Sequence, residues 1–216
     1  MKNSSLLPLW LFPIDSPLKI ISPTEEKIAK SLPPKRAYQY KQARGYTRFA
    51  LSKFLNLHAL EIPLDAEPGK APKLENNLGY ISFSHCRDAL LVGWSSDKIG
   101  VDLERNDRLL AANKLANRFF TQEELLHLKN VEPSKINSKV LEKWVLKEAV
   151  IKWQRGKISK DLTQWNINQE STIASHNKLN YKTNISFKHY RDWFIGIAYS
   201  YLIHKNNIVI YSNSNK

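Results

Sequence analysis

The clearest fold signal in the chain is the stretch YISFSHCRDALLVGWSSDKIGVDLE, residues 80–104. It contains three runs rich in β-branched, aromatic and aliphatic residues, over 80–84, 89–94 and 99–104, separated by two short turns. Short turns between such runs are typical of antiparallel strands. The stretch therefore predicts an antiparallel meander of three strands.

Helical patterns lie on both sides of this meander. Three stretches in which apolar residues recur at helical spacing predict helices: 41–57, 109–120 and 135–155. A capping box of Thr121 and Glu124 opens a further short helix. Three later runs predict strands: 184–189, 193–201 and 208–211. This order of elements predicts an α+β chain of two similar-sized halves, with a boundary between residues 100 and 108.

The composition narrows the classes of function. The chain has 216 residues, with 33 Lys and Arg against 20 Asp and Glu, and a formal net charge of +13. Such a charge favours an anionic partner, namely nucleic acid, a phosphorylated small molecule or an acidic protein. The single cysteine, Cys86, excludes an intramolecular disulfide and a cysteine-based zinc cluster.

The hydrophobic runs of the sequence are short. The apolar run over residues 6–13 is interrupted by two prolines and lacks a small-residue cleavage site after it. No run approaches the roughly 20 apolar residues that a membrane helix needs. We therefore expect a cytoplasmic protein without a signal peptide or a membrane span.

Two carboxylates share one face of the last strand of the meander. Side chains alternate along a strand, so Asp102 and Glu104 point to one side, and Ile99, Val101 and Leu103 point to the other. Carboxylate oxygens are the protein ligands that Mg²⁺ takes, together with water and phosphate. An amphipathic strand that exposes two acids to water has the same pattern, so the pair alone leaves both interpretations open.

The long predicted helix places a charged pair within an apolar stripe. At about 100° per residue, Glu148 and Lys152 fall in the middle of the stripe formed by Leu141, Trp144 and Val145. A charged pair that faces a core is costly unless it is paired or binds a metal. A surface (i, i+4) pair is the alternative, but the position within the stripe favours a functional role.

Three weaker signals indicate anion binding. Ser84 and His85 end a strand just before a turn, where a hydroxyl and an imidazole can donate to phosphate. Lys70 follows Gly69 in a proline-rich loop, where the backbone permits close approach and the ammonium supplies a point charge. The predicted helix over 41–57 has a basic side, either a solvated face or an anion site: Lys41, Arg44 and Arg48.

These signals occur in a recognisable order. The motifs are QARGYTR (42–48), GKAP (69–72), FSH (83–85), GVDLE (100–104), FFTQEE (119–124) and WVLKEAVIK (144–152). Over about residues 33–158 the chain resembles the 4′-phosphopantetheinyl transferase superfamily, in its long, single-chain, pseudo-dimeric group. Two positions depart from that family's pattern: Cys86 stands where serine is usual, and Ala71 is an extra residue in the Gly-Lys-Pro loop.

The resemblance implies an architecture and an activity. The expected fold is α+β, with two similar halves, residues 1–103 and 104–216, each a small antiparallel sheet with a packed helix, and an active site between them. The expected reaction transfers phosphopantetheine from coenzyme A to a serine of an acidic apo acyl or peptidyl carrier protein. Mg²⁺, with Mn²⁺ as a substitute, is the expected metal, and 3′,5′-ADP is released. The expected protein is a monomer that binds neither nucleic acid nor a membrane.

The resemblance also implies a role for each candidate residue. The expected metal ligands are Asp102, Glu104 and Glu148. Glu148 is the expected base for the serine hydroxyl, and Lys152 is expected to stabilise or protonate the departing phosphate. The expected coenzyme A contacts are Arg36, Arg44, Arg48, Lys70, Ser84, His85 and Lys152. Among these, Arg44 is expected to meet the 3′-phosphate or the acidic carrier, with Arg36 and Arg48 as helpers.

Two other functions fit part of the sequence. A magnesium-dependent nuclease could use the same carboxylates and Lys152, and the positive charge would suit DNA, but the Gly-Lys loop and the Ser-His strand end would lack roles. A non-enzymatic nucleic-acid-binding module could use the basic segment over 19–53, but it would leave the core-facing Glu148 and Lys152 unexplained.

Overall fold

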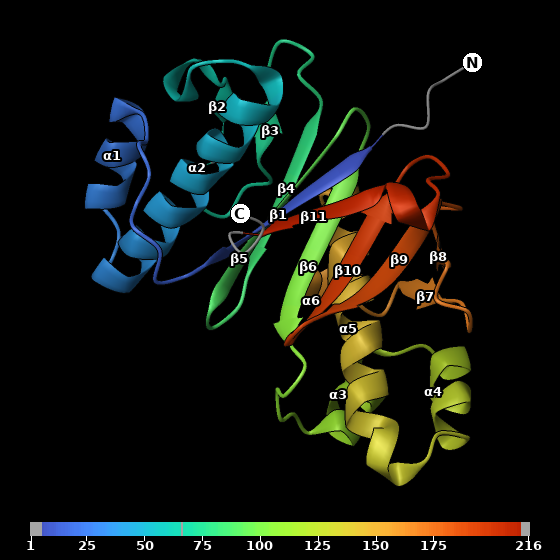
Figure 1. Cartoon of the computed structure of the whole chain (residues 1–216). Coiled ribbons are helices and arrows are strands. Elements are labelled where there is room, and N and C mark those ends of the chain that lie inside the picture. Colours follow the sequence, from blue (N-terminus) through green and yellow to red (C-terminus); the bar gives the residue numbers. More distant parts are fainter. Residues whose placement is uncertain (1–5, 66, 213–216) are drawn as a thin grey trace.

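Two β-sheets organise the chain, whose computed structural model describes residues 6–65 and 67–212 (Figure 1). The first sheet consists, in spatial order, of β11 (Ile208–Ser212), β1 (Leu7–Pro13), β5 (Ala89–Ser95) and β4 (Tyr80–His85). The second consists of β6 (Ile99–Arg105), β10 (Trp193–Tyr199), β9 (Lys182–Tyr190), β8 (Ile173–His176) and β7 (Trp165–Ile167). Neighbouring strands are antiparallel except β1 and β11, which are parallel.

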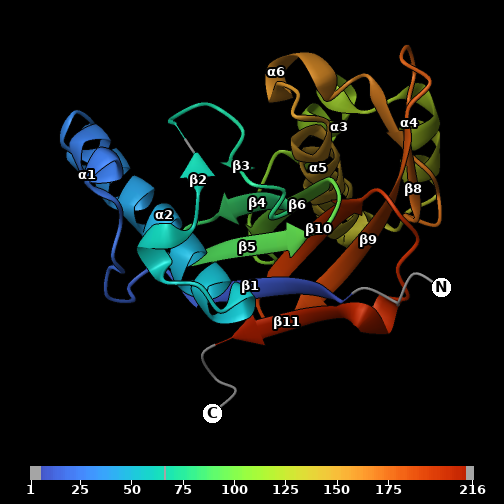
Figure 2. The same ribbon diagram turned by 90° about the horizontal axis from the view of Figure 1, so that it is seen from above.

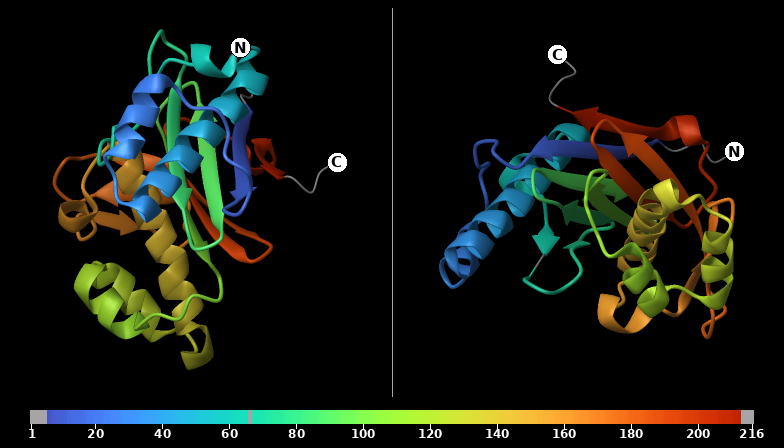
Figure 3. Two further views of the ribbon diagram at one scale, coloured as in Figure 1. Left: turned by 90° about the vertical axis from the view of Figure 1, so that its left-hand side faces the viewer. Right: turned by 90° about the horizontal axis from the view of Figure 1, so that it is seen from below.

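The helices lie in two groups (Figures 1 and 3). α1 (Pro23–Lys30) and α2 (Pro34–Leu55) lie beside the first sheet, with the β2 (Leu64–Asp65) and β3 (Lys73–Leu74) ribbon. α5 (Ile136–Gln154) lies on the second sheet, followed by the short α6 (Ile158–Asp161). α3 (Ala112–Phe119) and α4 (Gln122–Lys129) gather around the start of α5. The mixture of helix and sheet confirms the predicted α+β class.

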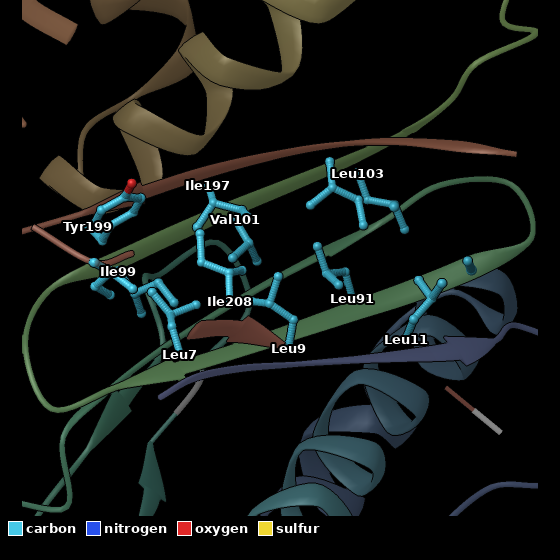
Figure 4. Packing of buried hydrophobic residues seen from close by; sticks show 13 residues of the cluster. Leu7, Leu9, Leu11, Leu91, Ile99, Val101, Leu103, Ile197, Tyr199 and Ile208 are labelled. Carbon is cyan, nitrogen blue, oxygen red and sulfur yellow. The ribbon is translucent and has the colours of Figure 1, made fainter. Parts of the chain in front are cut away.

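A shared hydrophobic core joins the two sheets (Figure 4). Side chains of β1 and β5 meet side chains of β6 and β10 in one buried cluster, which includes Leu9, Leu91, Val101, Leu103 and Ile197. Val101 and Leu103 belong to the strand side that alternation predicted to be apolar, and both are buried. The opposite side of β6 therefore faces α5 and β4, where the two carboxylates lie.

The predicted three-stranded meander is correct for its first two strands and wrong for the third. β4 and β5 form an antiparallel pair, but β6 pairs with β10 in the other sheet. β4 and β6 still touch, because the Ser82 hydroxyl accepts from the Val101 backbone N–H at 3.0 Å. A run of alternating residues predicts a strand, but it does not identify the neighbouring strand, which is chosen by packing.

Sheet membership crosses the predicted division of the chain in both directions. β11, near the C-terminal end, completes the first sheet beside β1, and β6, which begins before residue 103, belongs to the second sheet (Figure 2). The assignment of residues 1–103 and 104–216 to two matching halves stays a prediction. Among the described residues, no helix combines the length and apolar character needed to cross a membrane.

Two glycines let α5 lie directly on the second sheet. A Cβ atom at Gly100 would lie 1.9 Å from the Ala149 carbonyl oxygen, and one at Gly196 would lie 2.3 Å from the Val145 carbonyl oxygen. Only glycine accommodates such a close approach between strand backbone and helix backbone. This contact brings the C-terminal half of α5 against β6, where the candidate site residues lie.

Candidate functional site

The candidate site lies between β4, β6 and the second half of α5. Asp102 stands at its centre and is 3% exposed. Its Oδ1 accepts the Ser84 hydroxyl at 2.7 Å and the Lys152 ammonium at 2.6 Å. Its Oδ2 is buried and has no hydrogen-bond partner in the described part of the chain. Three elements distant in sequence thus meet at one carboxylate with an orphaned oxygen.

Glu104 lies two residues further along β6, on the same side as Asp102. Its side chain is 19% exposed, and its carboxylate forms an ion pair with Arg108. Partial burial raises the pKa of Glu104, and the charge of Asp102 raises it further, whereas Arg108 opposes this shift. The second acid of the strand is therefore partly buried, close to the charge of the first, and paired with its own cation.

Glu148 adds a third carboxylate from α5. Burial raises the pKa of Glu148 to about 8, and the negative charges of Asp102 and Glu104 act in the same direction. Lys152 and Arg108 oppose the shift without cancelling it. Burial and the charges of the two neighbouring acids therefore favour the protonated form of Glu148 over the ionised form.

The donor set of this cluster suits a hard divalent cation. As placed, no three Asp, Glu, His or Cys side chains of the described residues form a closed metal-binding group. Asp102 is turned to Lys152, and Glu104 to Arg108. The orphaned Oδ2 of Asp102 and the mutual repulsion of three carboxylates are nevertheless features that a bound Mg²⁺ would relieve. The residues fit such an ion in their chemistry.

His85 lies beside this cluster and among several cations. Partial desolvation lowers the pKa of His85, and the nearby charges of Lys152, Arg36 and Arg44 lower it further. The imidazole therefore lies within electrostatic reach of three of the predicted anion-binding side chains. This convergence brings together residues from α2, β4 and α5.

The predicted arginines of α2 separate into two environments. Arg44 is 5% exposed, and its guanidinium lies 4.1 Å from the Tyr40 ring and 4.9 Å from the Phe83 ring, next to the strand that ends at His85. Desolvation lowers the pKa of Arg44. Arg36, Arg44 and the site therefore share one region of the molecule.

Arg48 lies one turn further along α2 and makes different contacts, and its predicted role toward coenzyme A stays a prediction. It is 3% exposed, and its guanidinium donates to both Glu25 oxygens, at 2.8 and 3.0 Å, and to the Ala59 and Ile62 carbonyls. The basic side predicted for the helix is thus split, because α1 covers part of it with Glu25. The sequence pattern did not reveal that contact.

A cationic pocket adjoins the carboxylates. It is lined by the loop over 69–72, the first half of β4, the start of β6 and the end of α5. Its lining includes four cations and no acidic residue: Lys70, Lys98, Lys152 and Arg155. Lys70 is exposed and pairs with Glu67 at 2.6 Å. Lys98 and Arg155 were not among the predicted residues, and no motif in the sequence pointed to them.

The sequence interpretation also missed a buried ion pair on the other side of α5. Lys147 and Glu124 are both fully buried, and Lys147 Nζ lies 2.8 Å from a Glu124 oxygen. Glu124 belongs to the motif FFTQEE (119–124), and Lys147 belongs to the motif WVLKEAVIK (144–152). The contact could not be read from the sequence because the two residues are far apart along the chain. The one available signal for a buried pair was that an acid and a lysine each stand among apolar residues.

Residues 98–198 match the family model described as the 4′-phosphopantetheinyl transferase superfamily. The matched segment includes the three carboxylates and Lys152. No curated protein matches the chain.

Proposed function

We propose that this chain, a member of the 4′-phosphopantetheinyl transferase superfamily through residues 98–198, transfers phosphopantetheine from coenzyme A to a serine of an apo carrier protein. In this reaction the serine oxygen forms a bond to phosphorus, the pyrophosphate bond of coenzyme A breaks, and 3′,5′-ADP leaves. The supporting observation is the cluster of Asp102, Glu104, Glu148 and Lys152 beside a pocket lined by cations and no acids.

The metal site is part of this proposal. Asp102, Glu104 and Glu148 would hold Mg²⁺, with Mn²⁺ as a substitute. When bound, such an ion neutralises pyrophosphate charge and orients the phosphorus under attack. Oδ2 of Asp102 is already buried and without a hydrogen bond among the described residues. Folding has therefore already removed water from this oxygen, and a metal ion need not do so.

Glu148 is the proposed base for the serine hydroxyl. Its pKa of about 8 in the metal-free chain marks a carboxylate that, once ionised, binds a proton more strongly than an ordinary glutamate. It can take the proton directly or through one water. Its place on α5 keeps it close to Asp102, as the electrostatic influence between them requires.

Lys152 is the proposed partner of the departing phosphate. Its side chain is 25% exposed, so the ammonium can reach a ligand while Asp102 holds it at 2.6 Å. A cation in this position offsets the charge that develops on the leaving 3′,5′-ADP. Ser84 acts beside it, since its hydroxyl is oriented by the same carboxylate oxygen.

The remaining cations are proposed to bind the donor. The cationic pocket would take the nucleotide end of coenzyme A, with Lys70 at its rim. His85, Arg36 and Arg44 would meet phosphate oxygens near the end of β4. The net charge of +13 would also draw an acidic carrier protein toward the site and favour rapid encounter. A cytoplasmic, monomeric protein without nucleic-acid partners stays a prediction.

The decisive experiment is intact-protein mass spectrometry of an apo acyl carrier protein incubated with this protein, coenzyme A and Mg²⁺. We expect a mass gain of one phosphopantetheine that disappears when a chelator is added. A parallel reaction with an apo peptidyl carrier protein covers the second class of acceptor. If neither carrier gains mass while the protein cleaves DNA in the presence of Mg²⁺, the transferase proposal is wrong and the nuclease is favoured.

Lys152→Ala tests the proposed chemistry within that assay. We expect kcat to fall much more than KM for coenzyme A rises, because the ammonium acts on the leaving group. Lys157→Ala is the matched control, since Lys157 is an exposed lysine five residues further on, outside the pocket lining. A change confined to KM would make Lys152 a binding residue only.

A further inference from the structure

An aromatic groove lies on the first sheet, away from the proposed site. It is formed by residues of β1, the end of α2 and β11: Trp10, Phe12, Phe49, Ala50, Lys53, Phe54, Tyr211 and Ser212. Five of these eight residues are aromatic, and none is acidic. The proposed function uses none of them.

Two rings of this aromatic groove, those of Phe54 and Tyr211, are open to solvent. Trp10 lies with its ring centre 5.6 Å from that of Phe54 and 6.0 Å from that of Tyr211, on which it stacks. Phe54 is 38% exposed and Tyr211 is 40% exposed. Leu57, just beyond the end of α2, is 36% exposed. Partly exposed rings gathered around a concave site are typical of a surface that buries a partner's apolar side chains.

The aromatic groove and the proposed site are at opposite edges of the same sheet. β11 is one edge strand and β4 is the other, with β1 and β5 between them (Figure 2). Within the described residues, β11 pairs only with β1, so its outer edge is open. A ligand in the aromatic groove therefore does not compete with coenzyme A or with the reacting serine.

Two lysines give the aromatic groove a positive charge. Lys53 Nζ lies 4.4 Å from the centre of the Phe49 ring, and Lys19 Nζ lies 4.8 Å from it. Neither lysine forms an ion pair with a carboxylate of the described residues, unlike Lys41 with Glu26. Two cations held over one ring, beside exposed aromatic side chains, complement a segment that carries both acidic and apolar residues.

The chain itself offers a poor occupant. Residues 1–5 (MKNSS) and 213–216 (NSNK) each contain a lysine and no acid, and the second has no apolar side chain. A second copy of the chain is also disfavoured, because each copy carries a net charge of +13 and would bring like charges together. Charge complementarity therefore favours an acidic segment of a different protein.

We propose that the aromatic groove docks an acidic peptide segment of a partner protein, with aromatic or leucine side chains inserted between Phe54 and Tyr211. Carboxylates of that segment lie against Lys53 and Lys19. The open edge of β11 runs alongside and can hydrogen-bond an extended backbone. This docking goes beyond the transfer reaction and does not depend on it.

Fluorescence anisotropy with a labelled synthetic peptide of alternating Glu and Phe or Leu residues tests the proposal. The comparison peptide has every Glu replaced by Lys and keeps the apolar residues. We expect the acidic peptide to bind about tenfold or more tightly than the comparison peptide, and its affinity to fall as salt is raised. Equal binding of the two peptides would overturn the charge assignment.

Matched variants locate the binding on the protein. Phe54→Ser with Tyr211→Ser should weaken binding about tenfold, and Lys53→Glu about threefold or more. Leu179→Ser and Lys178→Glu change an exposed leucine and an exposed lysine in the turn after β8, and should leave binding unchanged. Equal losses from Lys53→Glu and Lys178→Glu would indicate general charge attraction and overturn the proposal.

Two further measurements test whether the variants are folded and whether the chain associates with itself. Phosphopantetheine transfer by the Phe54 and Tyr211 variants should equal that of the parent chain, because the aromatic groove lies outside the site, and this also reports that the variants are folded. Sedimentation at several protein concentrations tests self-association. Dimerisation that Phe54→Ser abolishes would overturn the peptide assignment in favour of a second copy.

Discussion

Two groups of charged residues lie on different sides of helix α5. They look alike in sequence but differ in burial and in the number of partners that each charge has. On one side, Lys147 and Glu124 form a pair that is fully buried, which we call the sealed pair. On the other side, Asp102, Glu148 and Lys152 form the centre of a cluster that is partly open, which we call the open cluster. Lys147 and Glu148 are adjacent in the chain, so one residue of rotation separates the two groups.

The sealed pair is balanced and saturated. Lys147 donates to Glu124 at 2.8 Å and also to the Leu162 and Trp165 carbonyls. Glu124 accepts from the backbone N–H groups of Thr121 and Ile167. Every charge has a partner, so this pair ties α4 and β7 to α5 and leaves nothing for a ligand.

The open cluster is unbalanced and unsaturated. It gathers three carboxylates, counting Glu104, leaves Oδ2 of Asp102 without a partner among the described residues, and raises the pKa of Glu148 to about 8. Repulsion of this kind costs stability, and a bound cation would remove it. The comparison indicates that buried charges with a full set of partners stabilise the fold. Buried charges without enough partners indicate a site that can bind a ligand.

The largest effect should come from breaking the sealed pair. Lys147→Met leaves Glu124 buried without its cation, and we expect the free energy of unfolding to fall by about 3 to 5 kcal/mol in urea denaturation. Lys139→Met, on the exposed start of α5, is the control and should change it by less than about 1 kcal/mol. Adding Glu124→Gln to Lys147→Met should restore part of the loss, and a loss equal to the control's would contradict the sealed pair.

The next effect should come from removing one charge of the open cluster. Asp102→Asn preserves the shape of the side chain but removes the charge that faces Lys152 and the proposed metal, so we expect phosphopantetheine transfer to fall about 100-fold or more. Stability should change much less than in Lys147→Met. Asp192→Asn, at a 63% exposed acid, is the control. Full activity of Asp102→Asn would remove Asp102 from the site.

A third effect concerns the pH dependence of stability. Glu148 in the folded, metal-free chain binds its proton more strongly than in the unfolded chain, so stability should fall as pH rises from about 5 to the folded-state pKa of about 8. Glu148→Gln cannot ionise and should lose this slope, and it should be more stable than the parent at pH 8 by about 4 kcal/mol. Urea denaturation at several pH values, with chelator present, measures it. Parallel slopes for the two proteins would contradict the repulsion inferred for the open cluster.

The smallest effect should come from the rim of the cationic pocket. Lys70 is 73% exposed and pairs with the exposed Glu67, so Lys70→Ala should raise KM for coenzyme A about two- to threefold and leave kcat and stability unchanged. The increase should shrink as salt is raised, because screening weakens an exposed charge. Steady-state kinetics at two salt concentrations measure it. A fall in kcat would place Lys70 within the open cluster's chemistry.

Several elements could be predicted because their signals are local. α5 was expected over 135–155 and spans Ile136–Gln154, and the strands β4, β5 and β6 lie where the alternating runs predicted them. The capping box at Thr121 and Glu124 opens α4 as expected. Helical spacing, strand alternation and caps depend on neighbours within a few residues, so the sequence alone contains them.

Other features depend on contacts between distant segments. β1 is a central strand of the first sheet, although its residues were interpreted only as a short apolar run, and β11 pairs with it from the far end of the chain. Arg48 was expected near coenzyme A but is enclosed by Glu25. Lys98 and Arg155 reach the cationic pocket from turns that carry no motif. Each of these outcomes depends on which segment covers which face.

The sequence by itself determined the α+β class, the main helices and strands, and the match of residues 98–198 to one family model. It did so because periodicity and motif spacing are properties of neighbouring residues. Only the tertiary structure decided that β6 pairs with β10 and not with β5. It also decided that Lys147 is fully buried in an ion pair while burial raises the pKa of the adjacent Glu148, and that an aromatic groove lies beside β11. Burial and electrostatic repulsion are properties of surroundings, and surroundings exist only once the chain has folded.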